Sequence, residues 1–446
     1  MSKNKGIVLA LVLIMFMSAI ETSIVSLATP TMQRDFNIET EVALIFTVYL
    51  IAVVFMTPIV GELVKRINIK FVVLLGISVF IIGSVFCGLS EMTNSFPLLV
   101  ISRIVQGLGA GVMMTLGQVV PKLAFPIPQR YKVMGIVGSV WGISSIVGPL
   151  LGGAILEYLN WSFLFYINVP IALISIWLVI KYFNFEQEKV EKTKLDYKGL
   201  LIFYGVVASF LLIVAEHIPL IVRGICFVIL IALAFTLYKI ETSIKNPFVP
   251  IEAFNRKIIL VLFTDLLYST MLMGYTIFMP IYLQNEQGFS PLQSGLTIFP
   301  MSVGWLFITF ILGRLDKIKL KFIYLLAFLA MFVGSFAIIT GVEWIVIIPF
   351  AVFVMGVSFG TVYTKDVVVV QEEAPSHQLG SMMSIYTLFK TIGSTTGSLI
   401  VASIYVLDVP FLTYGVQNIM LYIILVAVTL TIAWSLIFKE ANRDSI

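Results

Sequence analysis

The chain has 446 residues, of which 59% are hydrophobic and 12% are charged, and its mean hydropathy is +1.05. Soluble domains carry about a quarter charged residues, so this composition excludes an ordinary soluble enzyme and indicates many membrane-spanning helices. The net charge of +4 is modest and gives no reason to expect a nucleic-acid partner. Two cysteines in apolar runs, Cys87 and Cys226, exclude a disulfide framework, and we expect no metal site.

Fourteen apolar runs approach or exceed the length of about 20 residues that a helix needs to cross a bilayer. The first run is not followed by a small-residue cleavage site, which favours a retained helix over a signal peptide. An even number of spans places both ends of the chain on one side of the membrane. The runs are 6–28, 42–64, 71–90, 96–120, 131–157, 163–184, 199–216, 219–239, 258–283, 292–313, 322–341, 345–371, 379–406 and 415–438.

The basic residues orient these spans. With the N-terminus in the cytoplasm, 23 of the 28 lysines and arginines fall in cytoplasmic segments, and only Arg34 and Arg223 lie at the outer face. Cytoplasmic loops of membrane proteins are enriched in lysine and arginine. We therefore predict a multi-pass membrane protein with both termini in the cytoplasm.

The first span contains the stretch SAIETSIVSLATP, in which Glu21 is the only ionisable residue between Gly6 and Leu27. A charge at the centre of a bilayer costs roughly 2.5–3.5 kcal/mol on insertion scales. We interpret Glu21 as a carboxyl group that binds a proton or a cationic substrate. The alternative is a structural partner for a basic residue such as Arg103.

Five further ionisable residues lie at membrane depth. Arg103 is in the fourth span, Asp265 in the ninth, the neighbours Lys365 and Asp366 in the twelfth, and Lys390 in the thirteenth. Asp265 is a candidate for a second proton or substrate site, with a brace to Lys390 or Lys365 as the alternative. We interpret Lys365 and Asp366 as a structural pair.

Two glycine patterns recur in the same order. Gly135 and Gly148 are 13 residues apart, as are Gly380 and Gly393, and a further glycine follows four residues after each pair. A duplication of a six-helix bundle explains both spacings, whereas close helix packing alone explains only single glycines. We therefore predict an all-α membrane protein with two pseudo-symmetric six-helix bundles and two inserted helices. The predicted parts are residues 1–185, 186–257 and 258–446.

Several motifs resemble one family. IETSIVSLATP (20–30), LVISRIVQGLGAG (99–111), SSIVGPLLGG (144–153) and PIYLQNEQGFSPLQSGLTIFP (280–300) are similar to motifs of the major facilitator superfamily, in its fourteen-helix drug:proton antiporter branch. The resemblance covers nearly the whole chain. It departs from the family pattern at Lys65, where an aspartate is usual, and at Trp161-Ser162-Phe163, where Trp-Arg-Trp is usual.

The resemblance implies roles for particular residues. It places the central cavity on spans 1, 4, 9 and 12. Glu21, Arg103 and Asp265 then become candidates for proton coupling, although Arg103 can instead brace two helices. The candidate substrate-binding residues are Glu21 and Asp265, together with Tyr275, Met113, Met114 and Tyr363. The glycine–proline motif of the fifth span, which is expected to form a pliable gating seam, consists of Gly148, Pro149, Gly152 and Gly153.

The function expected from these features is export of lipophilic cationic drugs in exchange for protons, without a cofactor and by a monomer. No nucleotide-binding or hydrolase motif is present in the sequence, so neither an ATP-driven pump nor an enzyme is expected. The main alternatives are a tetracycline–metal antiporter and an exchanger of Na⁺ or K⁺ for protons. A channel and a nutrient symporter fit the motifs less well.

Overall fold

The computed structural model describes residues 2–64, 67–126, 129–184, 197–214, 218–243, 253–312, 318–341, 346–374 and 379–437. Within these ranges the chain is helical and contains no strand. The helices form two compact units, one of Met1–Tyr204 with Leu283–Leu296 and one of Gly205–Tyr282 with Thr297–Ile446. The three-part division predicted from the sequence stays a prediction.

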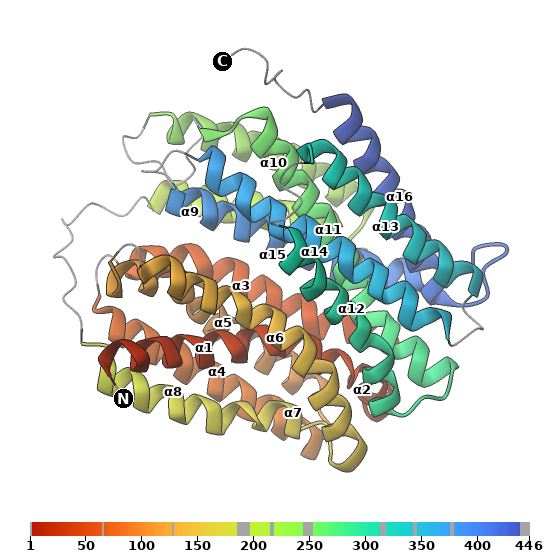
Figure 1. Ribbon diagram of the computed structural model, residues 1–446, viewed down its shortest axis with the longest axis horizontal. Coiled ribbons are helices and arrows are strands. Elements are labelled where there is room, and N and C mark those ends of the chain that lie inside the picture. Colours follow the sequence, from red (N-terminus) through yellow and green to blue (C-terminus); the bar gives the residue numbers. More distant parts are fainter. Residues whose placement is uncertain are drawn as a thin grey trace. The chain divides into compact units, whose positions relative to one another are not determined.

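The first unit is built on pairs of long helices. α1 packs against α6 and α8, while α5 packs against both α3 and α4 (Figure 1). The helices of this unit are α1 (Lys3–Ser26), α2 (Thr29–Phe36), α3 (Ala43–Leu63), α4 (Ile69–Met92), α5 (Phe96–Ala124), α6 (Gln129–Tyr158), α7 (Phe163–Tyr166), α8 (Asn168–Tyr182) and the beginning, as far as Tyr204, of α9 (Tyr197–Val214).

The second unit has the same kind of pairing. α11 packs against α15 and α16, and α13 packs against α14 and α16. If α11 corresponds to α1, and α13, α14, α15 and α16 to α4, α5, α6 and α8, these pairs repeat those of α1, the α4–α5 pair and a further contact of the first unit between α4 and α8. The helices are the rest of α9, α10 (Leu220–Glu241), α11 (Arg256–Ile281), α12 (Pro291–Leu312) from Thr297 onward, α13 (Leu320–Gly341), α14 (Ile347–Glu373), α15 (Leu379–Tyr405) and α16 (Gly415–Ile437). The start of α12 belongs to the first unit, as does the π-helix Tyr282–Glu286 from Leu283 onward.

Local sequence explains where several of these helices begin. The side chains of Asn68, Ser95 and Asn255 accept hydrogen bonds from backbone amides in the first turns of α4, α5 and α11. These amides have no partner inside the helix, so a side-chain acceptor at this position stabilises the helix start. At the other end of α2, Asn37 has a φ of 51°, a left-handed conformation that ends the helix.

The fourteen-span prediction was wrong. Among the described residues, 12 helices are long and apolar enough to cross a membrane. The predicted span 199–216 forms α9, whose apolar part, Lys198–Ile213, falls in the 10–17-residue class and is too short. The predicted span 379–406 forms α15, which is long enough but is rich in serine and threonine and contains Lys390. Polar side chains therefore lower the hydropathy of a helix that packs against α11.

The helices also differ in how much of their apolar surface is buried. Only 6% of the apolar window of α10 is buried, compared with 72% for the window that covers α11. The exposed side chains of α10 include Ile221, Phe227, Val228 and Phe235. An apolar helix with such exposure needs lipid or another apolar surface around it, whereas the buried α11 can hold functional side chains.

Candidate functional site

The first unit buries an ion pair that joins α1 to α5. Glu21 and Arg103 are both fully buried, and the guanidinium Nη1 of Arg103 lies 2.6 Å from Oε1 of Glu21. The other carboxylate oxygen, Oε2, accepts a hydrogen bond of 3.0 Å from Nδ2 of Asn168, at the start of α8. The structure thus brings together the two residues that the sequence analysis placed on the first and fourth spans.

Arg103 is held on several sides. Its Nε donates to the backbone carbonyl of Ile45 at 3.0 Å, and its Nη1 also donates to Oε1 of Gln106 at 2.6 Å. The guanidinium carbon lies 4.3 Å from the ring centroid of Tyr49. A cation over an aromatic face gains about 2 kcal/mol when both are desolvated. These contacts fix the positive charge, so Glu21 faces a rigid counter-ion.

Three polar atoms of this network have no hydrogen-bond partner within the described ranges. They are Nη2 of Arg103, the hydroxyl of Tyr49 and Oδ1 of Asn168. Buried polar atoms are usually hydrogen-bonded, so unpartnered atoms in a native protein need an explanation. Two of these atoms belong to direct partners of the Glu21 carboxylate, the donor Nη2 of Arg103 and the acceptor Oδ1 of Asn168, and both can form hydrogen bonds in a second arrangement of the network.

The second unit buries two carboxyl groups. Oδ1 of Asp265, on α11, accepts a hydrogen bond of 2.9 Å from the hydroxyl of Tyr386. Oδ1 of Asp366, on α14, accepts one of 2.5 Å from the hydroxyl of Tyr324. Both aspartates are fully buried, and Oδ2 of each has no hydrogen-bond partner in the described part of the chain. Lys390 lies within electrostatic range of both.

Of the predicted substrate contacts, Tyr363 lies in this second cluster. Its ring is 3.8 Å from the Lys390 ammonium, and its hydroxyl is 3.1 Å from the Ser269 hydroxyl. Tyr275 is buried on α11 but is ten residues beyond Asp265, roughly 15 Å along the helix. The structure therefore places Tyr363 beside a charged group and Tyr275 well away from Asp265.

Met113 and Met114 lie at a distance from the ion pair of the first unit. Both are on α5, ten or more residues beyond Arg103, which is roughly 15 Å along the helix. Met113 is buried and Met114 is half-buried. The structure thus does not bring either methionine to the Glu21 carboxylate.

The glycine–proline motif on α6 lies between two other segments of the same unit. A Cβ at Gly148 would collide with the Ser23 side chain on α1, and one at Gly153 would lie 3.0 Å from the backbone of Leu292. A Cβ at Gly295 would collide with the carbonyl oxygen of Pro149. The motif thus allows two close helix contacts, one with α1 and one with the start of α12.

The glycine repeat has the same packing role in both units. Gly148 and Gly152 pack on α1, whereas Gly393 and Gly397 pack on Leu266 and Thr270 of α11. One offset of 245 residues relates both glycine pairs, and applied to Glu21 it gives Leu266, the residue after Asp265. The two acidic residues therefore occupy nearly equivalent positions beside equivalent glycines.

Sequence reasoning missed several partners of these charges: Tyr49, Gln106, Asn168, Tyr324 and Tyr386. Gln106 lies three residues after Arg103, and side chains at this spacing on a helix are neighbours, so this contact could have been predicted from the sequence. The other four lie on different helices from the charges that they contact. Nothing in a single sequence indicates how those helices are rotated against each other.

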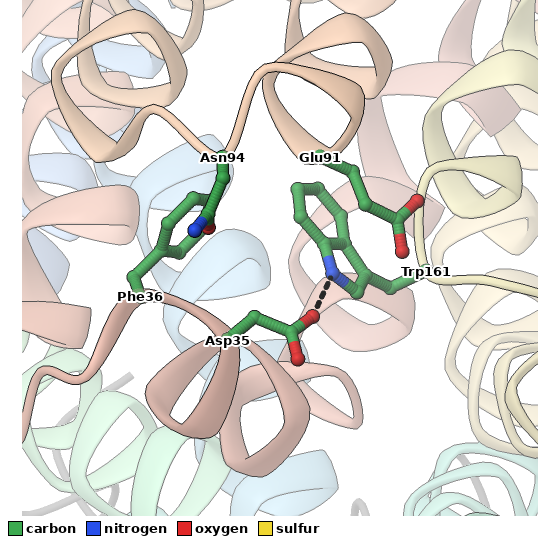
Figure 2. A pocket seen from close by; sticks show the side chains of 5 residues that line it. All are labelled: Asp35, Phe36, Glu91, Asn94 and Trp161. Atoms are coloured by element: carbon green, nitrogen blue, oxygen red, sulfur yellow. Dashed lines mark hydrogen bonds between the residues drawn. The ribbon is translucent and has the colours of Figure 1, made fainter.

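A small cavity of about 260 Å³ lies elsewhere in the first unit, lined by Asp35, Phe36, Glu91, Asn94 and Trp161. Figure 2 shows the Asp35 carboxyl pointing at the indole of Trp161, whose Nε1 donates a hydrogen bond of 2.8 Å to it. The Glu91 carboxylate accepts one of 3.1 Å from the backbone amide of Ser162. The two hydrogen bonds thus tie the segment before α7, through Trp161 and Ser162, to Asp35 and Glu91. The departure at Lys65 lies outside the described residues.

Charged groups buried inside a multi-pass helical protein mark ion or substrate pathways, so the fold and the two buried clusters indicate a membrane transporter. The chain belongs to the major facilitator superfamily, whose family model matches residues 11–398. It is 48% identical over 440 residues to the multidrug efflux pump SdrM of Staphylococcus aureus (strain N315), covering 98% of each chain. It is 28% identical to the multidrug transporter protein MdtP of Bacillus subtilis (strain 168), covering 89% of this chain and 74% of MdtP.

A solved structure shares the fold. The crystal structure of a D-xylose-proton symporter superposes with a TM-score of 0.68 at 13% identity, covering 96% of this chain and 97% of the symporter. At this identity the likeness concerns the fold alone. The family match and the similarity to SdrM show that the chain is a transporter of this superfamily and not an enzyme.

Proposed function

We propose that the protein is a proton-driven multidrug efflux antiporter of a bacterial plasma membrane. The observation that carries the proposal is the fully buried Glu21–Arg103 pair, in a chain similar along almost its whole length to a multidrug efflux pump. Charged groups inside a membrane protein are costly and mark ion and substrate pathways. The proposed substrates are lipophilic cations, and both termini are cytoplasmic.

Glu21 is the proposed carrier of the exchanged proton. As an anion it is held by Arg103 and Asn168. Protonation removes the charge that attracts Arg103, so the pair separates and the unpartnered atoms nearby become available as new partners. A cationic drug competes with the proton because both bind the same ionised carboxylate. Binding of one therefore releases the other.

The gating motif supplies the proposed moving seam. Gly148 and Gly152 let α6 approach α1, which carries Glu21, and Gly153 together with Gly295 of α12 lets it approach the start of α12. Proline inside a helix removes a backbone hydrogen bond and weakens the helix there. Bending at this position transmits a change at Glu21 to the packing of α12. Alternating access by two rocking bundles is the proposed form of the cycle.

Asp265 is the proposed second acid of the cycle, and Tyr363 the proposed aromatic contact beside it. A second candidate function, exchange of Na⁺ or K⁺ for protons, rests on the unpartnered carboxylate oxygen of Asp265. Oxygen ligands of this kind suit hard cations. A transport panel with ethidium, tetracycline, Na⁺ and K⁺ under one imposed pH gradient separates the alternatives.

The experiment that tests the role of Glu21 is dye transport into everted membrane vesicles. We expect proton-driven ethidium uptake by the natural protein and none by Glu21→Gln, since an amide binds no proton. Glu157→Gln is the matched control, because Glu157 is an exposed carboxyl at the end of α6. Uptake by Glu21→Gln at the rate of the natural protein would remove Glu21 from the mechanism.

A further inference from the structure

The second unit contains a charge cluster in which Asp366 has no role in the proposed function. Asp265 and Asp366 come from α11 and α14 and lie within electrostatic range of each other and of Lys390, on α15. No part of the sequence analysis assigned a proton to Asp366. The other titratable groups around the two acids, from all the helices that pack there, are Tyr268, Tyr324, Tyr363, Lys365 and Tyr386.

The two carboxyl groups are alike in their hydrogen bonding. Oδ1 of each accepts a hydrogen bond from a tyrosine hydroxyl, and Oδ2 of each is buried without a partner in the described ranges. A buried acceptor that lacks a donor is costly, and more so when it carries charge. The same oxygen is well suited to hold a proton, because a protonated carboxyl group is neutral.

The charge count leads to the same conclusion. Within the described ranges, Lys390 is the one lysine that interacts electrostatically with both acids, whereas Lys365 interacts in this way with neither. Two ionised aspartates and the Lys390 ammonium leave one negative charge in a cluster whose acids are completely buried. Like charges at short range disfavour double ionisation, so two neighbouring carboxyl groups readily share one proton. In the first unit, by contrast, Glu21 is neutralised by Arg103 at 2.6 Å.

We propose that Asp265 and Asp366 share one exchangeable proton, with Lys390 as the fixed counter-charge, and that each transport cycle carries this proton in addition to the one on Glu21. The proton moves from Oδ2 of either aspartate to water on the side that the cluster faces, and no other bond changes. The inference rests on the proposed function, because it assigns a second proton to the same cycle. Its direct consequence is that two protons exchange for one drug cation.

This stoichiometry has an electrical signature. Exchange of one monovalent cation for one proton moves no net charge, whereas exchange for two protons moves one. In proteoliposomes without a pH gradient, an inside-positive potential then drives ethidium inward as protons leave. At equilibrium, about 59 mV corresponds to tenfold accumulation when one net charge moves. A passive leak of ethidium responds to the opposite polarity, so it is distinguished from exchange.

The experiment compares the natural protein with Asp366→Asn in proteoliposomes, with ethidium as the probe. A K⁺ gradient with valinomycin sets the potential, and the same gradient without valinomycin controls for direct K⁺ transport. We expect the natural protein to accumulate ethidium under either a potential or a pH gradient. Asp366→Asn should respond to the pH gradient alone. Glu157→Gln, whose carboxyl is exposed, should behave as the natural protein does.

Two results would overturn the inference. The first is electroneutral exchange by the natural protein, and the second is an unchanged response to potential in Asp366→Asn. If that variant transports nothing, proton release on ethidium binding decides, measured in weakly buffered detergent solution. The natural protein should release two protons per ethidium and Asp366→Asn one, and equal release by both would refute the shared proton. Absence of any pH-driven uptake by the natural protein would instead refute the proposed function itself.

Discussion

The Glu21–Arg103 pair makes a quantitative prediction about stability. Arg103→Gln removes the guanidinium that lies 2.6 Å from the carboxylate and leaves Glu21 with neutral hydrogen-bond donors such as Asn168. Breaking a buried ion pair on one side costs roughly 3–5 kcal/mol, because the other charge stays buried and uncompensated. We expect a loss of this size in the free energy of unfolding at neutral pH.

A second substitution separates the charge from the packing. Glu21→Gln in the Arg103→Gln background removes the uncompensated charge and should recover about 2 kcal/mol or more. Lowering the pH should reduce the cost of Arg103→Gln in the same way, because a protonated Glu21 needs no counter-ion. The free energies come from chemical denaturation of the purified variants in one detergent, analysed as a double-mutant cycle. A double variant no more stable than Arg103→Gln alone would refute the reasoning.

Further predictions concern helix packing and the hydrogen bond to Glu21. A Cβ at Gly393 would collide with the backbone of Leu266, whereas one at Gly138 would meet nothing within 4 Å. Thermal unfolding in detergent should therefore show that Gly393→Ala destabilises by about 1–3 kcal/mol and that Gly138→Ala stabilises by up to about 1 kcal/mol; equal effects would contradict the described contact. Asn168→Leu removes a bond to a charged acceptor and should cost about 1.5–3 kcal/mol. Because the Glu21 anion loses a donor, the pH profile of ethidium transport should also move to higher pH, and an unmoved profile would show that this bond does not influence proton exchange.

The predictions of fold class and of the buried charged residues came mainly from the composition and from the charged residues inside apolar runs. The all-helical membrane class followed from hydropathy. Glu21 and Arg103 were placed on spans that the structure packs together. The glycine spacings identified α6 and α15 as helices with equivalent contacts, because glycine at a four-residue interval exposes one face of a helix to close approach.

The error in the span count has a physical reason. A run of moderately apolar residues, such as 379–406, was counted as a span without weighing its serines and threonines. The pairing of Asp366 with Lys365, its neighbour in sequence, stays a prediction. Adjacent residues on a helix point about 100° apart, and the structure gives Asp366 a partner that the sequence did not indicate, a tyrosine hydroxyl on α13.

Proton movement during drug exchange shows whether Glu21 exchanges a proton for the drug. Proteoliposomes containing the natural protein and an internal pH indicator receive external ethidium, with no other gradient imposed. The account predicts that ethidium entry drives protons out and raises the internal pH, and that Glu21→Gln abolishes this change while remaining folded. Ethidium entry without any change in internal pH, or the same change in Glu21→Gln, would contradict the claim that this buried carboxyl exchanges a proton for the drug.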